Sequence, residues 1–379
     1  MRKQKILLIH NKYLNKGGED LAVESEIEFL KKFYNVEVIY FYNNFSAAAL
    51  FTSIFLNKNL KSEKIILKKI KEFEPEIVYF HNTWFKVWNN IFYKIEKNYN
   101  IKILVKLHNY RFLCANTFST SKHLLGREMC PSCGGTKNTL KRFNKYYSNN
   151  YLKSFLVNFY GKRYFKILKN SKIKLVLLTN FQKNKLIQLG FNIEKLHVFY
   201  NPIKLDQNIS RFRKDYFVYA GRLSSEKGLE ELVNVFESLS NNYQLLIIGT
   251  GPLYKNLKNI NFKNIKLLGE ISHIETLEYI KNSKALISNT KLYEGQPTIL
   301  CEASLLKVPS IFPNNGGINE FLPQNYSLFF DQSEVNSLEN LLNNIDSYDL
   351  EKISNENFKF MQTLLDFELQ YERFCKMLL

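Results

Sequence analysis

Short apolar runs alternate with amphipathic segments along most of the chain. Between the apolar runs of the first half, segments such as Asp20–Phe33 and Glu63–Phe73 repeat apolar positions at helical spacing. Strands that alternate with helices form parallel sheets covered on both faces, so the pattern predicts an α/β fold. The predicted strands of the first half are Lys5–His10, Val36–Tyr40, Ile77–His81, Ile103–His108 and Leu175–Leu178.

The alternation stops near Asn201-Pro202 and the polar stretch Lys204–Asp215, and then restarts. A chain of 379 residues suits two domains. We therefore predict a first domain over 1–203 and a second over 204–355, with a terminal helix at about 356–379 that packs back on the first domain. In the second half the predicted strands are Phe217–Ala220, Gln244–Ile248, Ile265–Leu268, Ala285–Ser288 and Ser310–Phe312, and the predicted helices are Leu229–Leu239, Ile274–Asn282 and Pro297–Leu305.

Composition narrows the class of protein. With 45% hydrophobic and 23% charged residues, the chain is not a disordered one. The apolar run Ile6–Ile9 is too short for a secretory signal, and no run approaches the roughly 18 apolar residues of a membrane span. The five cysteines are odd in number, which together with the missing secretory signal predicts a cytoplasmic protein with reduced thiols.

Positive charge is concentrated in the first half. Residues 1–200 contain 35 Lys and Arg against 13 Asp and Glu, whereas residues 201–379 contain 18 against 22. Within 137–174 there are eleven Lys or Arg, no acidic residue and many interleaved aromatics. This mixture predicts peripheral docking on the anionic inner face of a membrane. One alternative is that the aromatic side chains belong to the core and the lysines only solvate the domain. Another is that the first half binds nucleic acid, although no nucleic-acid-binding motif accompanies its positive charge.

The second half contains glycine turns after its predicted strands. Gly221–Gly228 (GRLSSEKG) places Arg222 and Lys227 where a diphosphate could bind at a strand end. The alternative for this segment is a solvated basic loop. Gly249-Thr250-Gly251-Pro252 is a second turn of this kind, without the spacing of a dinucleotide fingerprint. Taken alone, it is better explained as a plain strand–helix turn.

A pair of glutamates, Glu294 and Glu302, frames the start of a predicted helix. Pro297 suits the first helical turn, so the backbone amides near Gln296–Ile299 would face an anion. In that arrangement Glu294 accepts hydrogen bonds from sugar hydroxyls and Glu302 from a ribose diol. The alternative is a helix cap and a surface ion pair. A further glycine loop, Gly316-Gly317-Ile318-Asn319-Glu320, follows the next predicted strand.

In this order, from Gly221 to Glu320, these four motifs resemble the retaining glycosyltransferases of family four, the glycosyl transferases group 1. The first half resembles the same family in three segments, although a single strand-end histidine is more often structural. The segments are Gly17-Gly18-Glu19-Asp20, His81-Asn82-Thr83 and Leu107-His108-Asn109-Tyr110.

The resemblance implies a GT-B architecture, in which two Rossmann-like domains face a cleft. It also implies retaining transfer of a hexose from a UDP- or GDP-sugar to a glycan acceptor, lipid-linked, in surface polysaccharide or lipopolysaccharide biosynthesis. No cofactor or metal is expected, in agreement with the absence of a D-x-D triplet. A nucleotide-sugar epimerase of the same fold is the alternative.

The resemblance also assigns roles to single residues. It makes His108, Glu294, Arg222 and Lys227 catalytic, and it places His81 and Asn82 on the acceptor side. Donor binding falls to Gly17, Gly18, Arg222, Lys227, Gly251, Glu294, Gly295, Gln296, Pro297, Thr298 and Glu302.

Three cysteines form a partial zinc pattern. Cys130 and Cys133 have the C-x2-C spacing, and Cys114 adds a third thiol. The fourth ligand could be His123 or His108. The alternative is a reduced, packed cysteine cluster.

Overall fold

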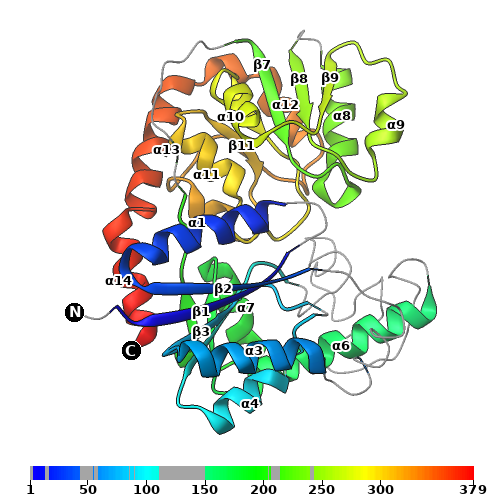
Figure 1. Ribbon diagram of the computed structural model, residues 1–379. Helices are drawn as coiled ribbons and strands as arrows, with labels where there is room; N and C mark the ends of the chain where they lie inside the picture. The colour runs from blue at the N-terminus through cyan, green and yellow to red at the C-terminus, as the bar shows by residue number, and fades with distance from the viewer. Residues whose placement is uncertain are drawn as a thin grey trace. The chain divides into compact units, whose positions relative to one another are not determined.

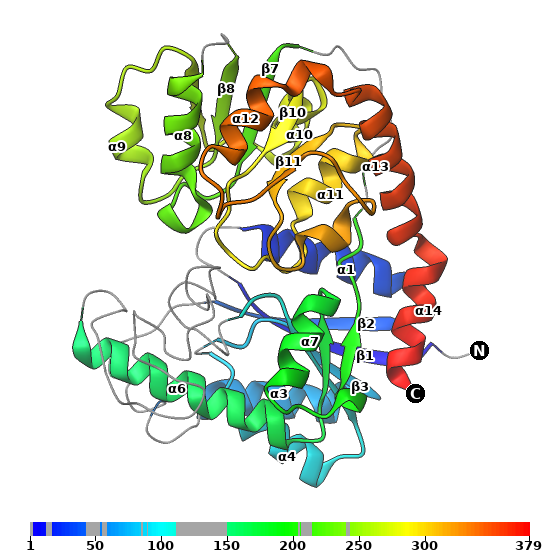
Figure 2. The same ribbon diagram turned by 180° about the vertical axis from the view of Figure 1, so that it is seen from behind.

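The computed structural model describes residues 3–12, 17–42, 54, 59–84, 86–88, 90–110, 150–203, 205, 214–239 and 243–379. The chain divides into two compact units, each with a parallel sheet between helices (Figures 1 and 2). The described residues up to Pro202, together with Phe367–Leu379, form the first unit, and Ile203–Asp366 form the second. Among the described helices, none has both the length and the apolar character that a bilayer crossing requires.

The first unit has a six-stranded sheet in the order β2-β1-β3-β4-β5-β6, in which all pairs are parallel. The direction of the strand order reverses at β1, which pairs with β2 on one side and β3 on the other. Its strands are β1 (Lys5–Lys12), β2 (Asn35–Tyr42), β3 (Ile77–Phe80), β4 (Lys102–Leu107), β5 (Lys174–Leu177) and β6 (Leu196–Val198). Its helices include α1 (Gly18–Phe33), α3 (Leu60–Phe73), α4 (Asn90–Asn98), α6 (Tyr151–Asn170) and α7 (Asn180–Gln188).

The second unit repeats this plan in the order β12-β11-β10-β7-β8-β9, again with parallel pairs. Here the order reverses at β7, which lies between β10 and β8. Its strands are β7 (Tyr216–Ala220), β8 (Gln244–Ile248), β9 (Ile265–Gly269), β10 (Ala285–Ile287), β11 (Ser310–Pro313) and β12 (Phe329–Phe330). Its helices are α8 (Leu229–Ser238), α9 (Tyr254–Lys258), α10 (His273–Lys281), α11 (Thr298–Leu305), α12 (Ser337–Asn343) and α13 (Leu350–Leu364).

The end of the chain differs from the single terminal helix predicted at 356–379. It consists of α13 and α14 (Phe367–Leu378), because the helical path stops at Leu365, whose N–H still bonds to the Met361 carbonyl. Helix α13 belongs to the second unit, so this unit runs to Asp366 rather than to 355.

Helix α14 packs on the first unit. Phe374, Met377 and Leu378 are buried in the apolar core that also contains strands β1 and β3. The carbonyls at its end accept hydrogen bonds from two lysines of the sheet: Lys174 Nζ lies 2.9 Å from the Met377 oxygen, and Lys102 Nζ bonds to that of Leu378. Cations at a helix C-terminus satisfy its orphan carbonyls and oppose the negative end of its dipole, so these contacts anchor α14.

Three polar side chains form a network inside the first unit. Lys106 Nζ lies 2.6 Å from Glu26 Oε2, and both side chains are fully buried. The Tyr79 hydroxyl donates to the other oxygen of Glu26 at 2.7 Å. Lys106 also lies over the Phe199 ring, 4.7 Å from its centroid. A buried ion pair is tolerated when its remaining lone pairs are hydrogen-bonded, and Glu26 meets this condition on both oxygens.

This pair predicts an asymmetric response to mutation. Lys106→Met should destabilise the first unit by about 3–5 kcal/mol, because it leaves the Glu26 carboxylate buried without its cation. The double variant Lys106→Met/Glu26→Gln should recover most of that loss, since no uncompensated charge remains. Urea unfolding of both variants measures the difference. Equal destabilisation of the single and double variants would contradict the assignment of the pair as ionised.

Candidate functional site

In the second unit the candidate site lies where the strand order reverses. Ligands of open α/β sheets bind at the carboxyl ends of the strands at such a point. The GRLSSEKG segment follows β7 and ends at Gly228, which has a φ of +65°. A Cβ on Gly228 would lie 1.9 Å from the Asn289 carbonyl oxygen, just after β10. Only glycine therefore allows these two chain segments to lie in contact.

This contact brings two predicted site residues together. Lys227 Nζ lies 2.6 Å from Glu294 Oε1, and Thr290 donates to the same oxygen at 2.8 Å. Arg222 is exposed, and none of the hydrogen bonds or ion pairs among the described residues involves its guanidinium. One cation of the site is thus held by a carboxylate, while the other points to solvent.

The glycine turn after β8 packs on the same segment. A Cβ on Gly249 would lie 2.0 Å from the Gly221 oxygen, and one on Gly251 would lie 2.4 Å from the Leu223 oxygen. Backbone bonds from Leu223 N to the Thr250 oxygen, at 3.0 Å, and from Leu253 N to the Leu223 oxygen, at 3.0 Å, close the contact. Backbone packing alone therefore explains the glycine at 251, which the sequence assigned to donor binding.

Glu302 has a partner that sequence reasoning missed. His273 Nε2 lies 2.9 Å from Glu302 Oε1, and the contact joins the first residue of α10 to the middle of α11. The two residues are 29 positions apart, so no local spacing relates them. Helix α11 itself begins at Thr298, with Pro297 as its cap and the predicted contact residues Gly295 and Gln296 just before it.

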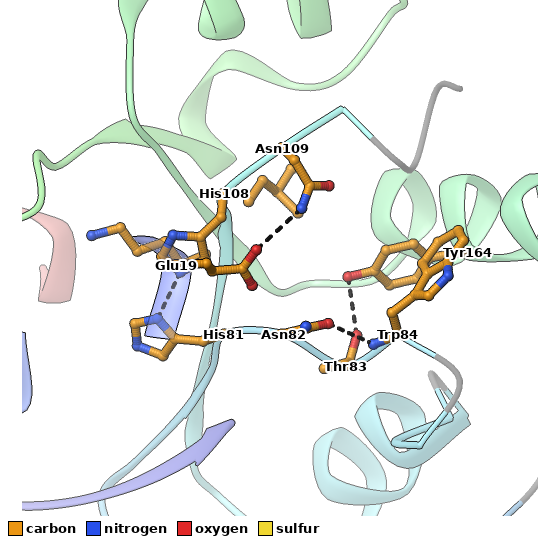
Figure 3. Close-up of a pocket in the computed structure, with 10 residues that line it drawn as sticks. Glu19, His81, Asn82, Thr83, Trp84, His108, Asn109 and Tyr164 are labelled. Carbon is orange, nitrogen blue, oxygen red and sulfur yellow. Dashed lines mark hydrogen bonds between the residues drawn. The ribbon is translucent and has the colours of Figure 1, made fainter. Parts of the chain in front are cut away.

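The first unit contains a small pocket at the ends of β3 and β4 (Figure 3). Its base includes a contact between two predicted site residues: His81 Nδ1 lies 2.9 Å from His108 Nε2, and the rings stack with centroids 5.2 Å apart. Across from them the Thr83 hydroxyl donates to the hydroxyl of Tyr164 on α6, at 3.2 Å. The lining residues are Glu19, His81, Asn82, Thr83, Trp84, Lys106, Leu107, His108, Asn109 and Tyr164.

Both histidines are held in the neutral form. Burial is the first cause that lowers the pKa of His81 well below 6.5, and His108, Lys106 and His10 lower it further. Burial likewise lowers the pKa of His108, followed by the charges of Lys106 and His10. A lowered pKa in a base means loss of the proton at neutral pH, so each ring carries a single N–H.

Gly17 and Gly18 mark the start of α1. Gly17 caps the helix, and its N–H lies 3.2 Å from Asp20 Oδ2. No atom of the described residues lies within 4 Å of a Cβ at position 17, so contacts among those residues do not require a glycine there.

The cysteine pattern at 114, 130 and 133 lies outside the described residues, as does His123. In the described ranges there is no cluster of three or more His, Cys, Asp or Glu side chains arranged to hold a metal ion.

Comparison with known proteins finds a family model that is similar to most of the second unit. Residues 203–357 match the family model described as glycosyl transferases group 1. An uncharacterized glycosyltransferase of Methanocaldococcus jannaschii is 26% identical over 206 residues, 52% of this chain and 57% of that protein. The putative teichuronic acid biosynthesis glycosyltransferase TuaC of Bacillus subtilis is 27% identical over 136 residues, 36% of this chain and 32% of that protein. The chain thus spans less than two thirds of the length of either relative.

A solved structure extends the similarity to the whole chain. The crystal structure of Anabaena HepE, in complex with UDP and glucose, superposes with a TM-score of 0.66 at 14% identity, covering 99% of both chains. At this identity the likeness concerns the fold. The chain therefore has the two-sheet α/β fold of GT-B glycosyltransferases, and its residues 203–357 match the glycosyl transferases group 1 model.

Proposed function

We propose that the protein is a retaining glycosyltransferase that moves a hexose from a nucleotide diphosphate sugar to a glycan acceptor. The observation that carries the proposal is the ion pair between Lys227 and Glu294 at the strand-order reversal of the unit that matches the glycosyl transferases group 1 model. Arg222 is exposed in the same GRLSSEKG segment as Lys227. The similar structure from Anabaena holds UDP and glucose, as its description states, which supports a UDP-sugar as donor. A GDP-sugar is the other candidate.

In the proposed reaction the bond between C1 of the donor sugar and the diphosphate oxygen breaks. The acceptor hydroxyl oxygen forms the new bond to C1 on the same face, and its proton passes to the departing diphosphate. Arg222 and Lys227 stabilise the charge that builds up on this leaving group. Glu294, with the backbone at Gly295 and Gln296, holds the sugar hydroxyls, and Glu302 holds the ribose. In the first unit, Gly17, Gly18 and His108 are the residues proposed for the donor, and His81 and Asn82 those proposed for the acceptor.

Substitution of the two cations tests the donor site. Arg222→Ala and Lys227→Ala should each lower kcat/KM by about a hundredfold or more, because each removes a group that acts on charge in the transition state. Glu294→Gln should depress transfer without unfolding the protein. Lys352→Ala, an exposed lysine on α13, is the matched control and should keep full activity. Steady-state kinetics with UDP- and GDP-sugars measure kcat/KM for each variant. Wild-type turnover in both cation variants would refute the assignment of Arg222 and Lys227 to the donor site.

We further propose that the two cations replace a metal ion at the leaving group. Activity should then survive excess EDTA, since Arg222 and Lys227 supply the positive charge that a divalent ion would otherwise provide. Assays with and without the chelator measure this. Loss of turnover that magnesium or manganese restores would contradict the proposal, and loss that only zinc restores would direct attention to the cysteines at 114, 130 and 133.

The acceptor proposed is lipid-linked, in surface polysaccharide or lipopolysaccharide biosynthesis, with the protein at the cytoplasmic face of a membrane. Teichuronic acid biosynthesis appears in the name of one relative, which supports a polysaccharide product. Helix α6 supplies the described part of the basic segment. Tyr151, Leu152 and Phe155 are exposed at its start, whereas Tyr160 and Tyr164 are buried, so the aromatics divide between a surface set and a core set.

Vesicle binding tests this placement. The variant Lys153/Lys162/Lys166→Glu changes exposed lysines of α6 only; Arg163 is left in place because it bonds to the Ile54 carbonyl at 3.0 Å. Each basic residue near an anionic surface is worth roughly 1 kcal/mol, so the variant should lose most co-sedimentation with anionic vesicles at low salt. The control Lys255/Lys258/Lys266→Glu makes the same charge change on the second unit and should bind normally. If the wild-type protein co-sediments with neither anionic nor neutral vesicles at low salt, the proposal is ruled out.

A further inference from the structure

Two side chains that line the pocket of the first unit have buried polar atoms without a hydrogen-bond partner in the described part of the chain. They are His81 Nε2 and Asn82 Nδ2, and the side chains are 2% and 7% exposed. An unsatisfied buried polar atom costs about 1–3 kcal/mol, and native proteins contain few. Two of them at one small pocket point to a ligand that satisfies at least one.

The hydrogen bond between the two histidines holds only one proton. In the first arrangement His81 Nδ1–H donates to His108 Nε2, which leaves His81 Nε2 as a bare lone pair and puts the hydrogen of His108 on Nδ1. In the second arrangement His108 Nε2–H donates to His81 Nδ1, which leaves an N–H on His81 Nε2. Because both rings are neutral, no third arrangement keeps the bond.

Burial of His81 Nε2 separates the two arrangements. The second one leaves an N–H donor buried without an acceptor, and orphaned donors are the rarer kind of unsatisfied group. The first one leaves only a lone pair without a donor. Its free energy is therefore lower, and it gives His108 a hydrogen on the nitrogen that bonds to no described residue.

The orientation of Asn82 is also fixed. Its Oδ1 accepts a hydrogen bond from the Trp84 backbone N–H at 3.0 Å. The amide nitrogen, Nδ2, is therefore the atom without a partner among the described residues. A flipped amide would face that N–H with its own donor and lose the bond.

We propose that His81 is a positioning residue that fixes His108 as the Nδ1–H tautomer, so that the pocket offers N–H donors from His108 and Asn82 to the oxygens of a neutral, hydroxyl-bearing sugar. Glu19 lines the same pocket, and its carboxylate repels an anionic ligand but accepts from a hydroxyl. A hydroxyl group can accept from the N–H groups of His108 and Asn82 and can donate to the carboxylate of Glu19. The tautomer stands on the contact between the two neutral rings and on the burial of His81 Nε2, whereas the sugar as ligand rests on the proposed function.

Histidine-selective 15N labelling of the full chain tests the tautomer. Two-bond 1H–15N spectra at neutral pH distinguish the protonated from the bare ring nitrogen, and single substitutions assign each signal. His108 should show a protonated Nδ1 and a bare Nε2. In His81→Phe, which keeps a ring of similar size but removes the donor, His108 should lose this single form. His197→Gln, on β6 of the same sheet, should leave it unchanged. A protonated Nε2 on His108 in the wild type, or no change in His81→Phe, would overturn the proposal.

The same signals test the ligand. Titration with methyl glucoside, galactoside and mannoside should shift the His108 resonances with at least one sugar, and Asn82→Asp should weaken that binding by roughly tenfold, the scale of one lost hydrogen bond. Glucuronate, which adds a carboxylate, should bind more weakly than glucose. If His108 has the expected tautomer but responds to none of the sugars, the ligand class is wrong. If sugars bind there but no nucleotide sugar is turned over, the proposed function fails instead.

Discussion

The reversal of strand order in each parallel sheet is the constraint on which the candidate site depends. All strands of a unit run the same way, so their carboxyl ends share one edge, and the chain leaves that edge in opposite directions on the two sides of the reversal. In the second unit this places the segment after β7 beside the segment after β10, so that Lys227 meets Glu294 across 67 positions of sequence. In the first unit His81 and His108 meet because they follow the adjacent parallel strands β3 and β4, which lie on one side of the reversal at β1.

Backbone contacts make this arrangement rigid. Gly228, Gly249 and Gly251 each lie where a Cβ would overlap the backbone of a neighbouring segment. A motif glycine of this kind is required whether or not a ligand binds, because the turns cannot stack without it. Gly17 differs, since a Cβ there would meet no atom of the described residues within 4 Å. Packing among the described residues therefore explains the first three glycines but not Gly17.

The sequence predicted the elements that its local pattern describes. Every strand predicted from an apolar run of four or more residues is present, because burial on both faces of a parallel sheet leaves an unbroken apolar signature. Strands β6 and β12, which have three and two residues, were missed. The break at Leu365 was missed as well, because neither proline nor glycine marks it.

Contacts between distant residues were beyond such reasoning. The sequence could place Glu302 on a helix and His108 after a strand. It could not show that His273 contacts Glu302 or that Lys106 lies near His108, because these contacts depend on how the elements pack. The distribution of charge between surface and interior was also beyond prediction from sequence. The excess of cations in the first half suggests a uniformly basic domain, yet its interior holds Lys106 paired with Glu26 and two neutral histidines. Among the described residues of that half, the excess positive charge therefore lies on the surface.

The two cations of the proposed donor site are held differently, and this difference bears on how the site would act. Lys227 is fixed by Glu294, which in turn accepts from Thr290, so its ammonium group has a set position before any ligand arrives. Arg222 is exposed, with its guanidinium outside the hydrogen bonds of the described residues. A pre-positioned charge needs no reorganisation when negative charge develops nearby, whereas a solvent-exposed guanidinium can meet a diphosphate with a bidentate fork. In this arrangement the proposed roles of the two cations differ. Arg222 would bind the diphosphate of the donor, and Lys227 would stabilise the negative charge that develops on it as its bond to the sugar breaks. Glu294 would then both hold Lys227 in place and keep an oxygen available for the sugar itself.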